Sequence, residues 1–506
     1  MSCRWRKDYV ALLLVLLFRN DIFYFYNTKI YRQLERYTQL QNIQNDIIAD
    51  KISLPQLVEY YLKNIEDKKH LNAFLEVFAD EAKSAAIHVQ QKMKEGNAGK
   101  LAGMVIGLKD NLCYKGHKVS ASSKILEGFT SIYSATAVER LLAEDAIIIG
   151  RLNCDEFAMG ASNENSAFGT VLNDADNTKV SGGSSGGCAV AVQADLCLAA
   201  LGSDTGGSVR QPAGFCGVYG LKPTYGRISR WGLIAYASSF DIIGPLTKSV
   251  DDAQILLEVI SGADEYDATS SDKPVDAYSK ASVSGQKLKI AYIKETIEMD
   301  GLQPEVKANI EKSIEQLRAQ GHTVEPVSFD MLDKMIPIYY TLTTAEASSN
   351  LARFAGMHYG FRSSNAHDFE STIRKSRSEG FGSEVKRRIM LGTFVLSAGY
   401  YDAYYTKAQK VRNLVKQKTD EIFSQYDFIM SPTSPTTAFK IGEKSDDPLA
   451  MYLADIFTVH ANIAGCAAIS IPNGVDNSNM PIGLQFMAKS FDEARLLAFV
   501  KNFRSE

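Results

Sequence analysis

Cysteine and histidine are scarce in this sequence, and neither is spaced as a metal or disulfide site requires. Among 506 residues there are seven cysteines and seven histidines, with no C-x-x-C pair and no H-E-x-x-H motif. This spacing argues against a zinc site, and an odd, scattered set of cysteines argues against a disulfide framework. We expect buried, reduced thiols of a cytosolic protein at Cys3, Cys113, Cys154, Cys188, Cys197, Cys216 and Cys466.

The chain also lacks a strong excess of charge of either sign. Its net charge is -4, from 55 basic and 59 acidic residues. Such a balance gives no sign that the chain binds nucleic acid through a net positive charge, although a different subunit could bind it. The hydrophobic content of 45% and the charged content of 23% are those of an ordinary globular protein. The length allows one large domain or two to three smaller ones.

The apolar run near the N-terminus is too short to cross a membrane. Val10–Phe18 follows three basic residues and has no small-x-small cleavage site after it, whereas a membrane span needs about 20 residues. An export signal, a short membrane-associating helix and residues added by an upstream start codon all fit this pattern, and we favour the last. We therefore predict an N-terminal extension over 1–36, one domain over 37–506, a cytoplasmic location and no membrane partner.

Glycine and serine are concentrated in Val180–Gly220, which holds ten of the 36 glycines. One glycine-flanked serine pair is Ser184-Ser185, and Ser208 follows Gly206-Gly207. Glycine lets main-chain N–H groups approach a ligand or a developing anion. The Ala/Val/Leu run between the two clusters predicts a buried helix followed by a buried strand. Two serines would then lie at neighbouring loop ends in a dry interior, as in a hydrolase.

Helical and strand patterns alternate along the rest of the chain, which predicts an α/β fold with a single large sheet. We expect a helical pattern over Leu40–Lys94, interrupted by an extended element and helical again from Asp80. Further helices are expected in Thr136–Ala143, Val250–Ile260, Pro304–Gln320, Ile338–Phe354 and Val385–Tyr426. We expect strands in Asn72–Val77, Leu101–Asn111, Ala146–Gly150, Lys287–Tyr292, His322–Glu325, Phe428–Met430, Ala467–Pro472 and Pro481–Phe486. Within Leu40–Lys94, Ser53 is expected to cap a helix that starts at Leu54, because Pro55 follows in its first turn.

Two serine mechanisms fit the glycine-rich stretch. In one, Gly182–Gly186 is the G-x-S-x-G elbow of an α/β-hydrolase, and Ser184 works with Asp455 and His460. That elbow needs an apolar strand directly before it, whereas Asn173–Lys179 has the composition of a loop. The local context therefore disfavours this mechanism.

The other mechanism makes Ser208 the nucleophile. Consecutive N–H groups of Thr205, Gly206 and Gly207 can converge on the oxyanion of a tetrahedral acyl intermediate. Without a well-placed histidine, the base would be a lysine kept neutral by burial and relayed through the second serine. Lys109 directly follows an apolar strand, where a lysine taken alone would be an ordinary surface residue.

Together, Lys109 in G-L-K-D-N, the S-G-G-S-S-G-G loop and G-S-D-T-G-G-S-V-R-Q-P-A resemble the amidase signature family. The resemblance covers about Tyr37 to the C-terminus and implies a mixed central sheet with helices on both faces. It implies Ser208 as nucleophile, Ser184 in a cis peptide as relay, and Lys109 as base and then acid. Asp204 and Arg210 would support the loop.

Within that family, the chain is similar to the glutamine-hydrolysing subunits of tRNA-dependent amidotransferases. The stretches that carry this similarity are Ala345–Phe354, Glu384–Tyr405, Ser431–Phe439 and Asp455–Thr458. The similarity implies that Arg388 holds the α-carboxylate of glutamine and Asp455 its α-ammonium, with Met159 and Tyr339 lining the pocket. Choosing Arg388 over the adjacent Arg387 rests on this resemblance. The chain departs from the family pattern near His460 and at Cys466-Ala467, which puts the pocket floor in question.

This resemblance also implies the function and the partners. The chain would hydrolyse glutamine without a metal and pass ammonia to two other subunits, B and C, in a heterotrimer. The complex would use ATP and Mg²⁺ on a partner subunit to convert Glu-tRNA(Gln) to Gln-tRNA(Gln), and the tRNA would be contacted mainly through that partner. The alternatives are a stand-alone amidase acting on small or hydrophobic amides and a catalytically inactive assembly scaffold.

Overall fold

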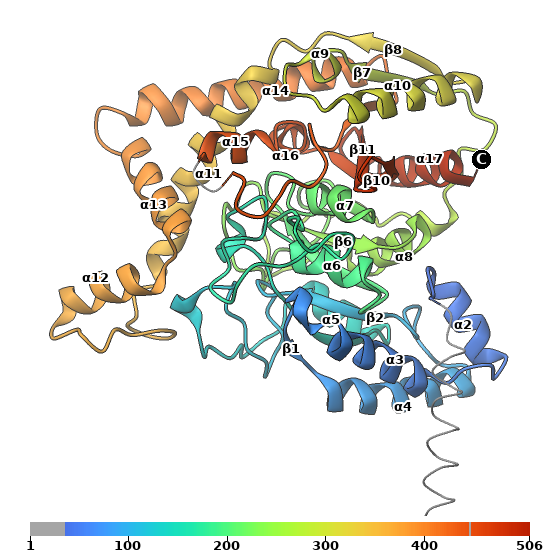
Figure 1. The fold of residues 1–506 in the computed structure, drawn as a ribbon, viewed down its shortest axis with the longest axis horizontal. Helices are drawn as coiled ribbons and strands as arrows, with labels where there is room; N and C mark the ends of the chain where they lie inside the picture. Colours follow the sequence, from blue (N-terminus) through green and yellow to red (C-terminus); the bar gives the residue numbers. More distant parts are fainter. Residues whose placement is uncertain (1–35, 445–446, 506) are drawn as a thin grey trace, which may run out of the picture.

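The fold is organised around one mixed β-sheet of eleven strands. The computed structural model describes residues 36–444 and 447–505. The strands lie in the order β1-β3-β2-β4-β6-β5-β10-β11-β9-β7-β8, from the blue N-terminal part to the yellow part at the top of Figure 1. They are β1 (Phe74–Val77), β2 (Val105–Lys109), β3 (Ile147–Leu152), β4 (Ala199–Asp204), β5 (Tyr219–Lys222), β6 (Ile242–Thr247), β7 (Lys289–Ile293), β8 (Thr323–Val327), β9 (Phe428–Pro432), β10 (Ala467–Val475) and β11 (Pro481–Ala488).

Parallel and antiparallel pairs occur in the same sheet. β2 is parallel to both β3 and β4, whereas β4, β6, β5, β10, β11 and β9 are joined by antiparallel pairs. The parallel pairs need crossover helices, which α5 and α6 provide. The α-helices are α2 (Leu40–Ile48), α3 (Leu54–Asp67), α4 (Ala79–Glu95), α5 (Thr136–Ala143), α6 (Gly186–Gln193), α7 (Arg210–Cys216), α8 (Val250–Ile260), α9 (Glu295–Glu298), α10 (Pro304–Ala319), α11 (Met335–Asn350), α12 (Phe369–Gly380), α13 (Ser383–Val395), α14 (Lys407–Phe423), α15 (Pro448–Leu453), α16 (Val459–Ala464) and α17 (Glu493–Ser505).

Both faces of the sheet are buried, each in its own hydrophobic core. Successive side chains of a strand point to opposite faces, and β10 divides its residues accordingly. Ile469 and Ile471 belong to the core that contains the apolar residues of α3, α8 and α17. Ala468, between them, belongs to the core formed with α11, α14 and α16. The predicted α/β class, with one mixed sheet between helical layers, is therefore confirmed.

Most of the predicted elements form where the sequence pattern places them. Thr136–Ala143 and Val250–Ile260 have the predicted ends. Ser53 caps α3 through a capping box with Gln56, which satisfies N–H groups that would otherwise lack acceptors. Two helices, α12 and α17, form in stretches where no helix was expected from the sequence pattern. Between α13 and α14 the backbone forms a short π-helix, Asp402–Thr406.

The cysteines and helices that the structure describes bear on the expected thiols and on membrane crossing. Six cysteines are free and buried, as expected, and Cys3 lies outside the described part. Among the helices that the structure describes, none combines the length and the apolar character that a membrane crossing requires. Residues 1–35 lie outside the described residues, so the extension over 1–36 and the domain over 37–506 stay predictions.

Candidate active site

The sheet brings the lysine and the two serine loops to one edge. Lys109 is the last residue of β2, and Ser208 lies just beyond the end of β4. β2 and β4 are parallel neighbours, with Leu108 opposite Leu201. Because the carboxyl ends of parallel strands meet at the same edge, residues about 100 positions apart in the sequence become neighbours.

Lys109 is a buried residue at the centre of a hydroxyl cluster. Its Nζ lies within hydrogen-bond distance of Ser184 Oγ at 2.7 Å, Ser185 Oγ at 2.8 Å and Ser203 Oγ at 3.0 Å. Its side chain is 0% exposed, so the alternative of a surface lysine is wrong. Burial lowers the pKa of Lys109, because the ammonium loses its hydration while its neighbours are uncharged hydroxyls. This environment favours a neutral amine.

Ser184 lies in the loop before α6, and its preceding peptide bond, Gly183–Ser184, is cis. The carbonyl of Ser184 accepts the N–H of Asp155 at 3.1 Å. The Asp155 carboxylate in turn accepts the N–H groups of Asn163 at 2.9 Å and Asn165 at 3.1 Å. Burial raises the pKa of Asp155 to about 6. Asp155 therefore fixes the loop that presents Ser184 to the lysine.

Ser208 lies beside this cluster and is 6% exposed. Its carbonyl accepts the N–H of Ser185 at 3.1 Å, which ties the two serine loops together. Within the described residues the Ser208 hydroxyl makes no hydrogen bond of its own. The lysine–Ser184 part of the predicted relay is thus formed, and the Ser208 hydroxyl is unengaged.

The loop between β4 and Ser208 is held by groups around it. Thr205 Oγ1 donates to Asp241 at 2.7 Å, and the carbonyl of Gly206 accepts Thr458 Oγ1 at 2.8 Å. The N–H of Gly207 donates to Asp204 at 2.9 Å. That donor of the predicted oxyanion hole is therefore already engaged. The N–H groups of Thr205 and Gly206 have no acceptor in the part of the chain that the structure describes.

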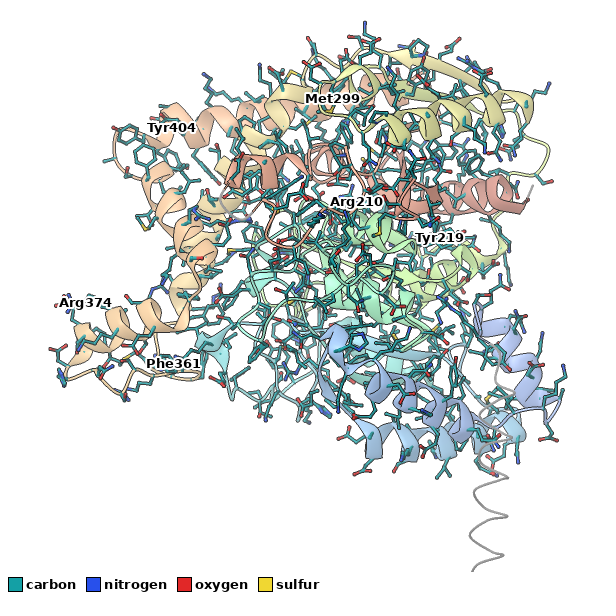
Figure 2. All side chains as sticks on the ribbon, in the orientation of Figure 1. Arg210, Tyr219, Met299, Phe361, Arg374 and Tyr404 are labelled. Carbon is teal, nitrogen blue, oxygen red and sulfur yellow. The ribbon has the colours of Figure 1, made fainter. Side chains whose placement is uncertain are left out.

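A buried ion pair anchors the same loop. Arg210, near the middle of the molecule in Figure 2, is fully buried and bonds Asp204 through Nε at 3.0 Å and Nη2 at 2.9 Å. Burial alone would raise the pKa of Asp204, but the charge of Arg210 outweighs it and lowers that pKa to about 2. Arg210 also donates to the carbonyl of Thr458 at 2.8 Å. The expected supporting role of both residues agrees with these bonds.

A buried cation lies on α13, which packs against α11. Arg388 is 3% exposed, whereas the side chain of the adjacent Arg387 is 51% exposed. Arg388 donates to Glu384 at 2.8 Å and to the Tyr236 hydroxyl at 2.9 Å. Its guanidinium also lies over the rings of Tyr236, Tyr340 and Tyr452. Of the two abutting arginines, only Arg388 faces the interior.

A buried carboxyl group, that of Asp455, lies in the same region. Asp455 is 6% exposed, and its Oδ1 has no hydrogen-bond partner among the described residues. Burial, reinforced by the charge of Asp204, raises the pKa of Asp455 well above its usual range, although Arg388 and Arg210 act against the shift. A buried carboxylate without a partner is costly. The site is therefore suited to a cationic ligand group near Arg388.

The two remaining predicted pocket residues, Tyr339 and Met159, are both buried in the apolar cluster on one face of the sheet. Tyr339, on α11, lies so close to Gly206 that an added Cβ there would be 2.5 Å from Tyr339 Cζ. Met159 is fully buried in the same apolar cluster as Tyr339 and Phe157. The structure thus gathers the predicted site residues around one region, and Gly206 is small because a ring lies against it.

Several side chains of the site were not predicted from the sequence. Ser185 and Ser203 bind Lys109 directly, and Asn111 donates to Ser203 at 2.8 Å. Asn111 follows Lys109 by two positions, so strand alternation is a signal that could have placed it on the same side. Asp241 and Tyr236 come from a loop far along the chain, and their role depends on tertiary contacts.

The alternative α/β-hydrolase triad is not formed. His460 is buried, and its Nε2 lies 2.8 Å from Thr419 Oγ1. Burial lowers the pKa of His460 to about 3. Before the Gly182–Gly186 turn there are two isolated bridges, Leu172 with Val180 and Lys179 with Lys440, and the residues directly before the turn form no strand. Around the sequence departures, α16 still includes His460, and β10 begins at Ala467. No group of three His, Cys, Asp or Glu residues in the described ranges could hold a metal ion.

The chain is similar over most of its length to known proteins. The family model described as Amidase matches residues 56–497. The A subunit of the glutamyl-tRNA(Gln) amidotransferase of Chlorobium limicola is 50% identical over 92% of this chain and 98% of the relative. The protein of the same name from Chlorobium phaeobacteroides is 51% identical over 91% of this chain and 97% of its own. The crystal structure of the corresponding protein from Thermotoga maritima superposes with a TM-score of 0.74 at 40% identity, covering 92% of this chain and 93% of that one.

Proposed function

The chain belongs to the amidase family, and from that premise we propose that it is the glutamine-hydrolysing subunit of a glutamyl-tRNA(Gln) amidotransferase. The observation that carries the proposal is the fully buried amine of Lys109, 2.7 Å from Ser184 Oγ, in the same region as the buried Arg388 and the buried carboxyl of Asp455, whose Oδ1 is unpartnered among the described residues. The first part suits amide cleavage, and the second suits a zwitterionic amino acid.

The reaction begins with proton transfer from Ser208 to Ser184 and from Ser184 to Lys109. Ser208 Oγ attacks the side-chain amide carbon of glutamine, and the oxyanion accepts hydrogen bonds from the N–H groups of Thr205 and Gly206, with Gly207 completing the loop. Lys109, now an ammonium, returns its proton through Ser184 to the leaving nitrogen. Ammonia departs and leaves an acyl-Ser208 ester. Water then hydrolyses the ester by the same relay and releases glutamate.

The pocket selects the free amino acid through its two charges. Arg388 would pair with the α-carboxylate and Asp455 with the α-ammonium, while Met159 and Tyr339 flank the aliphatic part. Arg388 already contacts Glu384 and Tyr236, so its guanidinium is held in place before the ligand arrives. A pre-oriented guanidinium loses little freedom on binding a carboxylate.

Ammonia would be used by partner subunits in this proposal. The relatives are named as the A subunits of amidotransferases, which supports an assembly with further subunits, B and C, in a heterotrimer. ATP and Mg²⁺ would be bound by a partner, which would also make the main contacts to Glu-tRNA(Gln). Gln-tRNA(Gln) would be the product of the complex.

The decisive experiment is glutaminase activity of the reconstituted complex with Ser208→Ala. We expect a loss of about 10⁴-fold or more, because the nucleophile is removed. Ser284→Ala, at an exposed serine, is the matched control and should retain activity. Appreciable turnover by the Ser208→Ala complex would refute the assignment.

A second measurement separates this function from a stand-alone amidase. An independent amidase would hydrolyse hydrophobic amides as a purified single chain and would be indifferent to Arg388→Ala. We expect instead that Arg388→Ala raises KM for glutamine strongly. Robust single-chain activity on hydrophobic amides that survives Arg388→Ala would favour the alternative. Complex assembly without any glutaminase activity would favour the inactive scaffold.

A further inference from the structure

The outer side of α13 and the segment after it expose a cluster of apolar residues, which we call the arm patch. Its members are 40% to 72% exposed: Met390, Leu391, Phe394, Tyr400, Tyr401 and Tyr404. The Phe394 ring lies 4.4 Å from that of Tyr400 and 5.8 Å from that of Tyr404. Figure 1 shows α12 and α13 extending from the body, and Tyr404 lies at the outer edge in Figure 2. A contiguous exposed apolar patch marks an interaction surface.

The same helix has a second, buried side. Arg388 and Gly392 lie on it, and a Cβ at Gly392 would overlap the Thr344 carbonyl of α11. This close packing joins α13 firmly to the helix that carries Tyr339. An occupant of the arm patch would therefore touch the reverse side of the helix that holds the buried arginine.

The surroundings of the arm patch are positively charged. Residues 369–418 contain eleven lysines and arginines but only four acidic residues, in a chain whose net charge is -4. Lys407 and Lys410, on the first turn of α14 directly after the patch, are exposed and have no acidic partner among the described residues. Such a rim attracts a partner of opposite charge and disfavours a basic one.

We infer that the arm patch is the docking surface for an acidic, amphipathic segment of a partner subunit. Apolar side chains of that segment would cover Met390 and Phe394, and its carboxylates would pair with Lys407 and Lys410. The inference rests on the proposed function, since it needs a partner that uses the ammonia. A protein partner is favoured over a lipid surface, because the relatives are named as subunits of an amidotransferase. Docking there can influence glutamine binding.

The test measures assembly of variants of the full chain with the two partner subunits of the same amidotransferase. Phe394→Glu and Met390→Glu should weaken the affinity at least 10-fold. Lys407→Glu combined with Lys410→Glu should slow association at low salt, and this difference should disappear at 1 M salt. Ile132→Glu, at an 80% exposed apolar residue elsewhere, is the matched control and should assemble like the wild type.

Milder changes guard against unfolding of the arm. Phe394→Ala and Tyr404→Ala only shorten exposed side chains and should weaken assembly several-fold with an unchanged thermal midpoint. Folded patch variants that assemble like the wild type would overturn the inference. The inference would also be overturned if the wild-type chain bound phosphatidylglycerol vesicles and Phe394→Glu abolished that binding. A dimer of the wild-type chain that Phe394→Glu abolished would overturn it as well. The proposed function fails separately, if the wild-type complex assembles but does not hydrolyse glutamine.

Discussion

Replacing Asp455 by asparagine should change stability and activity in opposite directions. In the folded chain Asp455 is buried, and its Oδ1 has no hydrogen-bond partner among the described residues. An ionised carboxylate in that position destabilises the fold until a cation binds it. Asparagine has nearly the same shape and carries no charge, so it removes the penalty and also the charge that the substrate ammonium needs.

Above the folded pKa of Asp455 and in the absence of substrate, the gain in stability should be about 1.4 kcal/mol for each unit by which folding raises that pKa. Its pH dependence follows from the pKa of Asp455, which burial raises well above its usual range. Folding raises the pKa of this carboxyl, so the wild-type fold becomes less stable as the pH rises from the unfolded pKa, about 3.9, through the folded pKa. Asparagine does not titrate. The advantage of Asp455→Asn should therefore grow over that interval and stay constant above it.

The variant should also lose catalytic efficiency with glutamine. Removing one partner of a desolvated charge pair costs about 2–5 kcal/mol, or about 30- to 4,000-fold in kcat/KM. The loss should be confined to substrates with an α-ammonium group. Glutaramate, which is glutamine without the α-amino group, should therefore be hydrolysed about equally by wild type and variant.

Thermal unfolding between pH 5 and 9 measures the stability difference. Steady-state kinetics of the complex with glutamine and glutaramate measures the substrate effect. Ser284→Ala, at an exposed position, should change neither quantity. An equal loss of kcat/KM for both substrates would refute the reasoning, because Asp455 would then act on something other than the ammonium. A destabilised Asp455→Asn chain would also refute it, because the carboxylate would then have a partner in solution.

Three further predictions concern the lysine, the ion pair and the glycine loop. Lys109→Arg should lower kcat about 100- to 10,000-fold, because a guanidinium stays protonated. The wild-type rate should fall as the pH drops below the lowered pKa of Lys109. A variant whose pH–rate profile still showed that fall would contradict the role of Lys109 as base. Arg210→Met should destabilise the fold by about 3–5 kcal/mol in urea unfolding at neutral pH. The destabilisation should shrink as the pH falls toward 2, where Asp204 loses its charge. An unchanged urea midpoint at neutral pH would contradict the pairing of Arg210 with Asp204. Gly206→Ala should reduce kcat/KM about 10- to 100-fold, since its Cβ would meet the Tyr339 ring, and full activity would show that the loop can yield.

The sequence alone determined the elements and the chemical repertoire of this protein. Helical periodicity predicted α5 and α8 with their observed ends, and the Ser53 cap marked the start of α3. The glycine-flanked serines and Lys109 pointed to acyl chemistry before any contact was known. These signals are local, because capping, turn formation and side-chain periodicity depend on residues a few positions apart.

Only the tertiary structure decided which groups meet. Strand order and helices from distant parts of the chain bring Lys109 to Ser185 and Ser203 as well as to Ser184. They also set the bond from the Gly207 N–H to Asp204 and leave Asp455 Oδ1 without a partner among the described residues. The same holds for α13, whose pattern predicted a helix but not that its apolar face would point outward. A periodic pattern reveals that a helix has two faces, and the packing of the whole chain selects which of them is buried.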